Sequence, residues 1–169
     1  MKLRSWQAEA FPLWWDKQQG IIKVVTGGGK TFFAIHCIKE YIKASPEKDI
    51  LIVVPSIALL DQWSEALSEN NINQEVLLNG GGEKVDKSAK IIVTTIDSLK
   101  NILDLVNAEN SLLIVDECHK IGTEKRGDML SNNWSATLGL SATPERDYDD
   151  NFYAIIKKIL GDIIFEYDY

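Results

Sequence analysis

A glycine-rich segment carries the first group of residues that could do chemistry. Three consecutive glycines stand directly before a lysine and a hydroxyl side chain in the series Thr26, Gly27, Gly28, Gly29, Lys30 and Thr31. Glycines accept backbone angles that turn successive N–H groups inward, and a helix beginning there adds a partial positive charge. Such a loop can enclose phosphate oxygens. Lys30 would then contact the outer phosphates of a nucleotide, and the Thr31 hydroxyl would bind Mg²⁺.

This segment, the glycine loop, departs at one position from the general phosphate-binding pattern. Val24 stands where the pattern G-x-x-x-x-G-K-[ST] asks for glycine. The alternative interpretation is a glycine-rich turn that caps a helix and is followed by an ordinary surface lysine. An apolar run before the loop and a helical pattern after it favour phosphate binding, because a phosphate-binding loop joins a strand to a helix.

A second group of residues follows an apolar run at 111–115 and consists of Asp116, Glu117, Cys118 and His119. The carboxyl ends of parallel strands face the ligand crevice of an α/β sheet, so the acid pair Asp116 and Glu117 should face the same phosphates. Asp116 would hold Mg²⁺, and Glu117 would orient and deprotonate the water that attacks the terminal phosphate. Alternatively, the two carboxylates only cap the next element. For His119, a role in coupling and an ordinary polar side chain both stay open.

The elements that must position these groups follow from the apolar pattern. Five short runs, at 21–25, 50–54, 91–93, 112–115 and 138–140, are mostly apolar and do not alternate, which is typical of parallel strands covered on both faces. Helical patterns occupy 31–44, with Pro46 just beyond, and 57–70, with Ser56 as a suitable N-cap. Residues 79–82 should form a turn, because they contain three glycines. The alternation of strands and helices predicts a doubly wound α/β fold.

Length and composition indicate one well-buried domain. The chain has 169 residues, of which 45% are hydrophobic and 25% charged, close to the averages for globular proteins. The formal net charge of -7 argues against strong nucleic-acid binding by this domain alone. From Glu145 onward the chain has seven carboxylates and three basic side chains, so the remainder is only mildly acidic.

Cysteine use and hydropathy bear on the compartment. Cys37 and Cys118 form no C-x-x-C pair, so neither a zinc site nor a disulfide framework is indicated, and we expect a reducing cytoplasm. No stretch approaches the roughly 18 consecutive apolar residues that a membrane span needs. We therefore expect no membrane partner.

Three segments, in order and spacing, resemble motifs I, II and III of the superfamily 2 helicases and translocases: GGGKT at 27–31, DECH at 116–119 and SAT at 141–143. Their wording is nearest to the XPB-type helicases and to the translocase subunits of type I and type III restriction enzymes. The resemblance implies a RecA-like P-loop NTPase fold, a three-layer sandwich with a mostly parallel central sheet. It also implies ATP and Mg²⁺ as cofactors and duplex DNA as the preferred track. Residues 1–169 then form the ATP-binding, first RecA-like domain, and the second RecA-like domain is absent from this chain.

The resemblance assigns further residues near the amino terminus and in the middle of the chain. Residues 3–7 look like the adenine-reading element, in which Arg4 contributes and the Gln7 amide selects adenine. Residues 53–63 and 91–99 look like motifs Ia and Ib, and the nucleic-acid contacts implied are Pro55, Ser56, Gly81 and Thr95. A hydroxyl at a helix amino terminus, such as that of Ser56, or at a strand end, such as those of Thr94 and Thr95, can bind a phosphodiester without added positive charge.

Coupling and full turnover are also assigned by resemblance. Ser141, Ala142 and Thr143, sharing a junction with His119, would pass the state of the ATP site to the nucleic-acid surface. Family members place an arginine finger on the second RecA-like domain, and neither Arg126 nor Arg146 sits in such a pattern here. Turnover by this chain alone should therefore be slow.

Two other functions compete with the motor interpretation. One is a nucleotide-responsive, nucleic-acid-binding switch that never translocates. The other is a different phosphate-loop enzyme, such as a small-molecule kinase, which would have no reason to carry SAT at 141–143 or Gln7. The five tryptophans could stack on bases, but aromatic residues at helical spacing are more typical of a core, which is the interpretation we adopt.

Overall fold

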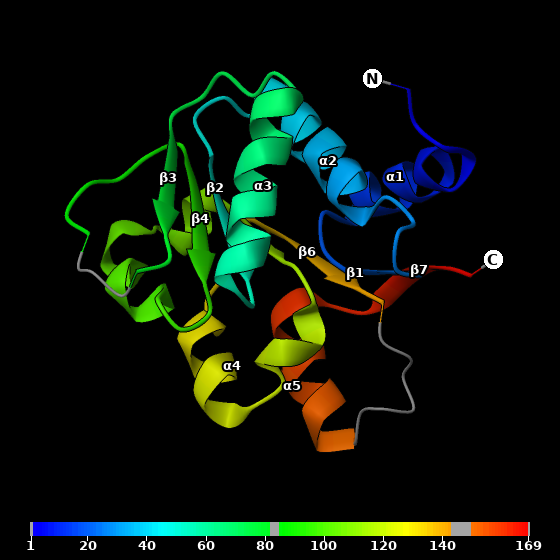
Figure 1. The fold of residues 1–169 in the computed structure, drawn as a ribbon. Helices are drawn as coiled ribbons and strands as arrows, with labels where there is room; N and C mark the ends of the chain where they lie inside the picture. The colour runs from blue at the N-terminus through cyan, green and yellow to red at the C-terminus, as the bar shows by residue number, and fades with distance from the viewer. Residues whose placement is uncertain (1, 82–84, 143–149, 169) are drawn as a thin grey trace.

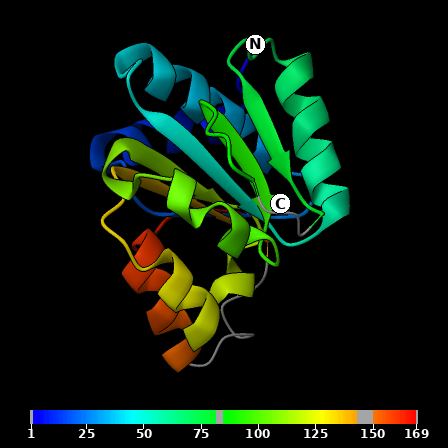
Figure 2. The same cartoon turned by 90° about the vertical axis from the view of Figure 1, so that its left-hand side faces the viewer.

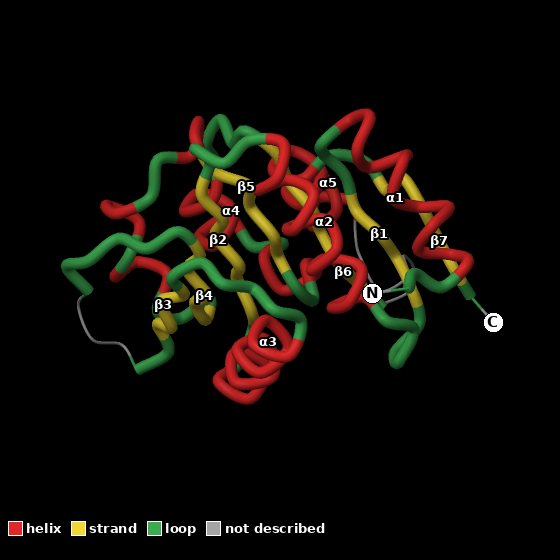
Figure 3. The backbone as a smooth tube through the Cα atoms, turned by 90° about the horizontal axis from the view of Figure 1, so that it is seen from above, coloured by secondary structure: helices red, strands yellow, loops and turns green. Residues whose placement is uncertain are grey.

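The computed structural model describes residues 2–81, 85–142 and 150–168, with only the backbone described at 151 and 152. Its described strands form one seven-stranded sheet in the order β3-β4-β2-β5-β6-β1-β7 (Figure 3), and every pair is parallel. The strands are β1 (Ile21–Val24), β2 (Asp49–Val54), β3 (Val76–Asn79), β4 (Ile91–Thr95), β5 (Ser111–Val115), β6 (Ala136–Ser141) and β7 (Ile163–Tyr167). The five predicted strands are confirmed, whereas β3 and β7 were not predicted.

Helices cover both faces of this sheet (Figure 1 and Figure 2). One face carries α1 (Ser5–Lys17), α2 (Lys30–Ala44) and α3 (Ile57–Glu69). The other carries α4 (Glu124–Leu130), α5 (Asp150–Leu160) and the 3-10 turns η1 (Leu99–Asn101), η2 (Leu103–Leu105) and η4 (Cys118–Ile121). A further turn, η3 (Ala108–Asn110), leads directly into β5. The predicted three-layer α/β sandwich is confirmed, with a sheet that is parallel throughout.

Alternating side chains of each central strand enter two separate cores. In β5, Leu112 and Ile114 pack with α1, α2 and α3, while Leu113 and Val115 pack with α4, α5 and the turns. Successive side chains of a strand point to opposite faces, so a strand covered on both faces is apolar at most of its positions. This double burial explains the consecutive apolar runs in the sequence.

The two predicted helices form close to their predicted bounds. Helix α2 begins at Lys30, after Gly29 in the left-handed region with φ 95°. Ser56 is the N-cap of α3, and its hydroxyl accepts a hydrogen bond from the backbone N–H of Leu59 at 3.3 Å. This bond satisfies one of the free N–H groups of the first helical turn. Both helix starts therefore lie at carboxyl ends of strands, after β1 and after β2.

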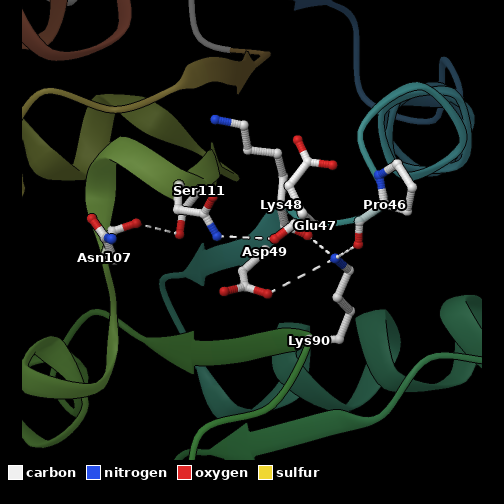
Figure 4. Close-up of polar contacts among 8 residues, drawn as sticks. Pro46, Glu47, Lys48, Asp49, Lys90, Asn107 and Ser111 are labelled. Atoms are coloured by element: carbon white, nitrogen blue, oxygen red, sulfur yellow. Dashed lines mark hydrogen bonds and ion pairs between the residues drawn. The ribbon is translucent and has the colours of Figure 1, made fainter.

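Polar contacts hold the opposite end of the sheet, where the central strands β2 and β5 begin (Figure 4). The Lys90 ammonium donates to the backbone carbonyls of Pro46 and Lys48 and lies 3.9 Å from the Asp49 carboxylate. Ser111 donates through its hydroxyl to the carbonyl of Asn107 at 2.7 Å. These contacts anchor the amino ends of the two central strands and leave their carboxyl ends for the site.

The two cysteines are buried and free, Cys37 in α2 and Cys118 in η4. Burial raises the pKa of both thiols, so the thiols stay protonated and weakly reactive at neutral pH. Of the helices in the described ranges, none combines the length and the apolar character that crossing a lipid bilayer requires.

Candidate nucleotide-binding site

The glycine loop joins β1 to α2, which is the context that phosphate binding needs. Gly27 and Gly29 have φ angles of 78° and 95°, in the left-handed region that residues with a side chain rarely adopt. A Cβ at Gly29 would also lie 2.9 Å from Nε2 of Gln7. The two glycines are therefore needed for the backbone path and, at Gly29, for the close approach of α1.

Side chains at the start of α1 hold the glycine loop by donating hydrogen bonds to the carbonyl oxygens of the loop. The Trp6 indole N–H and the Arg4 guanidinium donate to the carbonyl of Gly28 at 2.8 and 3.0 Å, and the Gln7 amide donates to the carbonyl of Gly29 at 2.9 Å. In a planar trans peptide the C=O and the following N–H point in opposite directions. The N–H groups of Gly29 and Lys30 are thereby directed away from α1, as a cradle for an anion requires.

Arg4 and Gln7, which the resemblance assigns to adenine recognition, lie at the glycine loop, and Gln7 is enclosed by protein. Its side chain is 0% exposed, and its Oε1 accepts a hydrogen bond from the backbone N–H of Arg4 at 2.7 Å. In this conformation the Gln7 amide ties α1 to the loop. An adenine ring would reach the Gln7 amide only after that amide had turned outward.

Lys30 folds back across the glycine loop. Its ammonium donates to the carbonyl of Val24 at 3.1 Å, a neutral acceptor that is weaker than a phosphate oxygen. The same positive charge lowers the pKa of Glu117, against the larger effects of burial and of Asp116. Lys30 and Glu117 therefore interact electrostatically, although 86 positions separate them in the sequence. The loop and the acid pair converge at one edge of the sheet, as predicted.

Asp116, directly after β5, is buried and held by two donors. Its carboxylate accepts from the Trp63 indole N–H at 2.9 Å through Oδ2 and from the backbone N–H of Glu117 at 2.9 Å through Oδ1. Its own N–H donates to the carbonyl of Val53 at 2.9 Å. Each carboxylate oxygen can accept more than one bond, so both keep capacity for a cation.

Glu117 has an unusual backbone and an unusual acidity. Its φ of 50° lies in the left-handed region, a conformation that costs free energy for a residue with a side chain and is concentrated at functional sites. Burial and the neighbouring Asp116 charge raise the pKa of its carboxyl, while Lys30 and Lys120 partly oppose this. The His119 imidazole Nδ1 lies 3.6 Å from Glu117 Oε2. A raised pKa suits a carboxylate that takes a proton from water.

A cavity of about 840 Å³, the site cavity, brings the separate motifs together. It is lined by Thr26, Pro55, Ser56, Leu59, Ile96, Glu117, His119, Lys120, Arg126 and Ala142. Ala142 and His119 share it, consistent with the predicted junction, and Ser141 is buried at the end of β6. Thr143 lies outside the described residues. A larger groove of about 1050 Å³ along α1 and β7 contains none of the predicted site residues, so the chemistry points to the smaller cavity.

The predicted nucleic-acid contacts differ in their accessibility. Ser56 and Gly81 are exposed and Pro55 is half-buried. Thr95 is 4% exposed, and its hydroxyl accepts from the N–H of Ser98 at 3.2 Å. The fully buried Thr94 hydroxyl likewise donates within the fold, to the carbonyl of Asn79 at 3.2 Å. A phosphodiester can therefore reach Ser56 and Gly81 directly, but it reaches the threonine hydroxyls only if β4 and its neighbours rearrange.

Sequence reasoning missed three site residues. Trp6 and Trp63 are buried, as a core interpretation expects, yet their indole N–H groups hold the glycine loop and Asp116. Arg126 lines the site cavity and donates to the carbonyl of Lys120 at 2.7 Å. The sequence contained a signal for Trp63. This residue follows Ser56 by seven positions, about two helical turns, and so lies on the same face of α3 as the N-cap.

The donor set of the site fits Mg²⁺. Thr31 offers a hydroxyl and Asp116 a carboxylate, both of them oxygen donors that Mg²⁺ prefers. Within the described ranges, His, Cys, Asp and Glu form no cluster of three or more that could enclose a metal. Such a sparse set suits Mg²⁺, which is commonly bound through one or two carboxylates, water and substrate phosphates.

Fold and site together define a RecA-like, ATP-binding domain of the superfamily 2 type. The family described as "Type III restriction enzyme, res subunit" matches residues 1–146, and the chain belongs to this family. The DNA 3'-5' translocase XPB2 of Sulfurisphaera tokodaii is 35% identical over 166 residues, which cover 98% of this chain and 36% of that protein. The chain thus spans about a third of the length of this relative.

Solved structures of low sequence identity share the fold. The Sulfolobus solfataricus SWI2/SNF2 ATPase core in complex with dsDNA superposes with a TM-score of 0.79 at 19% identity, over 95% of this chain and 36% of that one. The UvsW helicase of bacteriophage T4 gives a TM-score of 0.77 at 20% identity, over 98% of this chain and 60% of that one. These similarities establish the RecA-like architecture independently of the sequence motifs.

Proposed function

We propose that this chain is the ATP-hydrolysing half of a nucleic-acid-dependent helicase or translocase and that full activity needs a second RecA-like domain. One observation carries the proposal: the site cavity joins the glycine loop, through Thr26, to Glu117, His119 and the exposed start of α3 at Ser56. A nucleotide bound between the loop and the acid pair would thus lie beside a surface able to contact a phosphodiester. A small-molecule kinase has no need for that second surface.

The residues of the chain divide the chemistry of hydrolysis among them. The N–H groups of the glycine loop would bind the phosphates, and Lys30 would leave the Val24 carbonyl for the stronger acceptor of the outer phosphates. Thr31 and Asp116 would hold Mg²⁺, which supplies charge neutralisation at the transferred phosphate when bound. Glu117 would orient the attacking water and accept its proton. Arg4 and Gln7 would contact the base once the Gln7 amide turns outward.

Duplex DNA is the proposed track. The name of the Sulfurisphaera tokodaii relative describes a DNA translocase, and the SWI2/SNF2 core was solved with dsDNA. In this chain, the Ser56 hydroxyl accepts from Leu59 and keeps its own O–H for a phosphate oxygen. Lys120 and Arg126, which line the same cavity, add positive charge to an otherwise acidic protein. We propose Pro55, Ser56, Gly81 and the Thr95 region as the contact surface.

Coupling between nucleotide and DNA is proposed to pass through the end of β6. Ser141 and Ala142 lie there, and Ala142 shares the site cavity with His119. His119 in turn is 3.6 Å from the carboxylate of Glu117. A change at the attacking water would therefore be passed by the side chains of Glu117 and His119 to Ser141 and Ala142.

Replacing Lys30 by alanine is expected to weaken ATP binding about 10- to 100-fold. The substitution removes a charge-assisted hydrogen bond to phosphate, and bonds to charged groups are worth about 1.5 to 3 kcal/mol. Equilibrium titration with a fluorescent ATP analogue measures the effect. Lys43→Ala, in the exposed last turn of the same helix, is the matched control and should bind like the wild type. Equal affinities for the wild type and Lys30→Ala would remove the glycine loop from the nucleotide site.

Duplex DNA is expected to raise the ATPase rate at least severalfold, because in a nucleic-acid-dependent motor the bound duplex favours the conformation that hydrolyses ATP. The measurement is steady-state hydrolysis by the chain together with a second RecA-like domain, with and without duplex, single-stranded DNA and RNA. Stimulation by duplex DNA supports the motor. ATP-sensitive DNA binding without any stimulation of hydrolysis would instead identify a nucleotide-responsive switch.

A further inference from the structure

The bond between Trp63 and Asp116 is unlike the other indole contacts of the protein. Trp63, 1% exposed in α3, donates its Nε1–H to the carboxylate Oδ2 at 2.9 Å. Trp6, Trp14 and Trp134 donate instead to backbone carbonyls, at 2.8 Å each. A hydrogen bond to a charged acceptor is about twice as strong as one between neutral groups. Trp63 therefore makes the strongest type of contact among these four indoles, and it makes it to the predicted Mg²⁺ ligand.

Two donors fix the orientation of the Asp116 carboxylate. The indole occupies one lone-pair direction of Oδ2, and the N–H of Glu117 occupies one of Oδ1. The terminal torsion of an aspartate is otherwise broad, so without the indole the carboxylate would rotate about a single remaining bond. A planar ring buried in a core has few alternative rotamers. Trp63 thus supplies a rigid donor where a flexible polar side chain would not hold the angle.

The first turn of the same helix lines the site cavity. Ser56, the N-cap of α3, lines the cavity and is exposed, and Trp63 lies about two turns further along the helix. This 13-residue helix is unbroken from Ile57 to Glu69, and Leu60, Trp63 and Leu67 are its buried residues. The position of Asp116 is therefore tied, through one hydrogen bond, to the element that begins at the proposed DNA contact.

We propose that Trp63 is a positioning residue that sets the affinity of the site for Mg²⁺ by holding the Asp116 carboxylate. This inference rests on the proposed function, because it assumes that Asp116 and Thr31 bind Mg²⁺ with the nucleotide. Trp63 does not touch the nucleotide or the reacting atoms; it acts through Asp116. Its removal alters the metal dependence of nucleotide binding and leaves metal-free nucleotide binding unchanged.

The test compares Trp63→Phe with Trp14→Phe. Both substitutions keep an aromatic ring in a buried site and remove an indole N–H, but Trp14 donates to the backbone carbonyl of Thr137 and makes no bond to Asp116. Binding of a fluorescent, non-hydrolysable ATP analogue is titrated against Mg²⁺ and repeated in EDTA. For Trp63→Phe, the Mg²⁺ concentration at half-maximal binding should rise about tenfold, the loss of one hydrogen bond to a charged group. Trp14→Phe should keep the wild-type midpoint, and affinities in EDTA should agree within about twofold for all three proteins.

A second measurement needs no substitution. In ¹H–¹⁵N spectra of the wild type, the Trp63 indole resonance should shift when Mg²⁺ is added to the nucleotide-bound protein, while the Trp14 indole resonance stays. A Mg²⁺ midpoint equal to that of the wild type in Trp63→Phe, or an unmoved Trp63 indole resonance, would overturn the inference. If instead the wild type binds no nucleotide with Mg²⁺ present, the proposed function itself fails, and the two failures are thereby distinguished.

Discussion

Glu117→Gln is expected to lower the rate of ATP hydrolysis by about 10²- to 10⁴-fold, the usual contribution of a positioned general base. Glutamine keeps the size of the side chain but cannot accept the proton of the attacking water. Nucleotide affinity should stay near that of the wild type, because the glycine loop and Asp116 are untouched. Single-turnover hydrolysis and analogue binding, measured in the chain together with a second RecA-like domain, separate the two effects.

Glu124→Gln, in the exposed first turn of α4, is the matched control for this substitution. It removes one carboxylate of the same type outside the site cavity and should hydrolyse ATP at the wild-type rate. If Glu117→Gln kept wild-type turnover, the assignment of the base would be wrong. If it also lost nucleotide affinity, Glu117 would belong to the binding site instead.

Glu117→Gln should also stabilise the fold at neutral pH. The pKa of Glu117 is raised above the ordinary value of a glutamate side chain, chiefly by burial. Folding therefore favours the protonated carboxyl, and this stabilising contribution, complete at low pH, is lost as the pH rises through the raised pKa. Glutamine resembles the protonated form, so its Tm should exceed that of the wild type at pH 7, with the difference disappearing below about pH 4. Thermal unfolding across this range measures the effect, and a lower Tm for the variant at pH 7 would contradict it.

A second RecA-like domain is expected to accelerate ATP hydrolysis by this chain by about 10³- to 10⁵-fold, the effect of an arginine that stabilises the transition state. Arg4 donates to the glycine loop and Arg126 to the carbonyl of Lys120. These two arginines thus have internal partners, and Arg146 lies outside the described residues. The arginine finger is therefore proposed to come from the other domain by resemblance to the family. Turnover is measured for the chain alone and for the chain joined to a second RecA-like domain.

The control for this comparison is the same joined protein in which the arginine finger of the second domain is changed to alanine. That protein should lose most of the acceleration while keeping nucleotide affinity, because the arginine acts on the transition state and not on the bound substrate. Equal rates for the chain alone and the joined protein would show that the site is complete within these 169 residues.

The central strands could be predicted from the sequence because a strand buried on both faces forms a run of consecutive apolar residues. Strand β5 is apolar at four consecutive positions, 112–115, and no helix of five residues competes with that pattern. β3 and β7 were missed because edge strands are only partly covered: Leu78 is exposed and the side chains of β7 are half-buried or exposed. Helix α1 was missed because Pro12 lies inside it, and an internal proline normally ends a helical prediction.

The site was predicted where backbone position decides and missed where side-chain partners decide. The glycine loop and the acid pair follow strands whose carboxyl ends must meet, so their convergence could be deduced. That Gln7 is enclosed, that Thr94 and Thr95 bond within the fold, and that Trp63 holds Asp116 depend on how α1, β4 and α3 pack. Hydroxyls, amides and indoles can satisfy many partners, and sequence spacing does not choose among them.

The place of β1 in the sheet governs when this protein can acquire its activity during synthesis. β1 carries the glycine loop near the amino terminus, yet its two neighbours are β6 and β7, more than 100 residues later in the chain. Bringing together strands so far apart in the chain costs conformational entropy before the contacts between them can form. This cost slows folding. While β2, β3, β4 and β5 can pair on a growing chain, the strand that presents the nucleotide cradle must wait until β6 and β7 have been synthesised. Nucleotide binding would then require this domain to be completely folded, since a nucleotide stabilises only the folded domain.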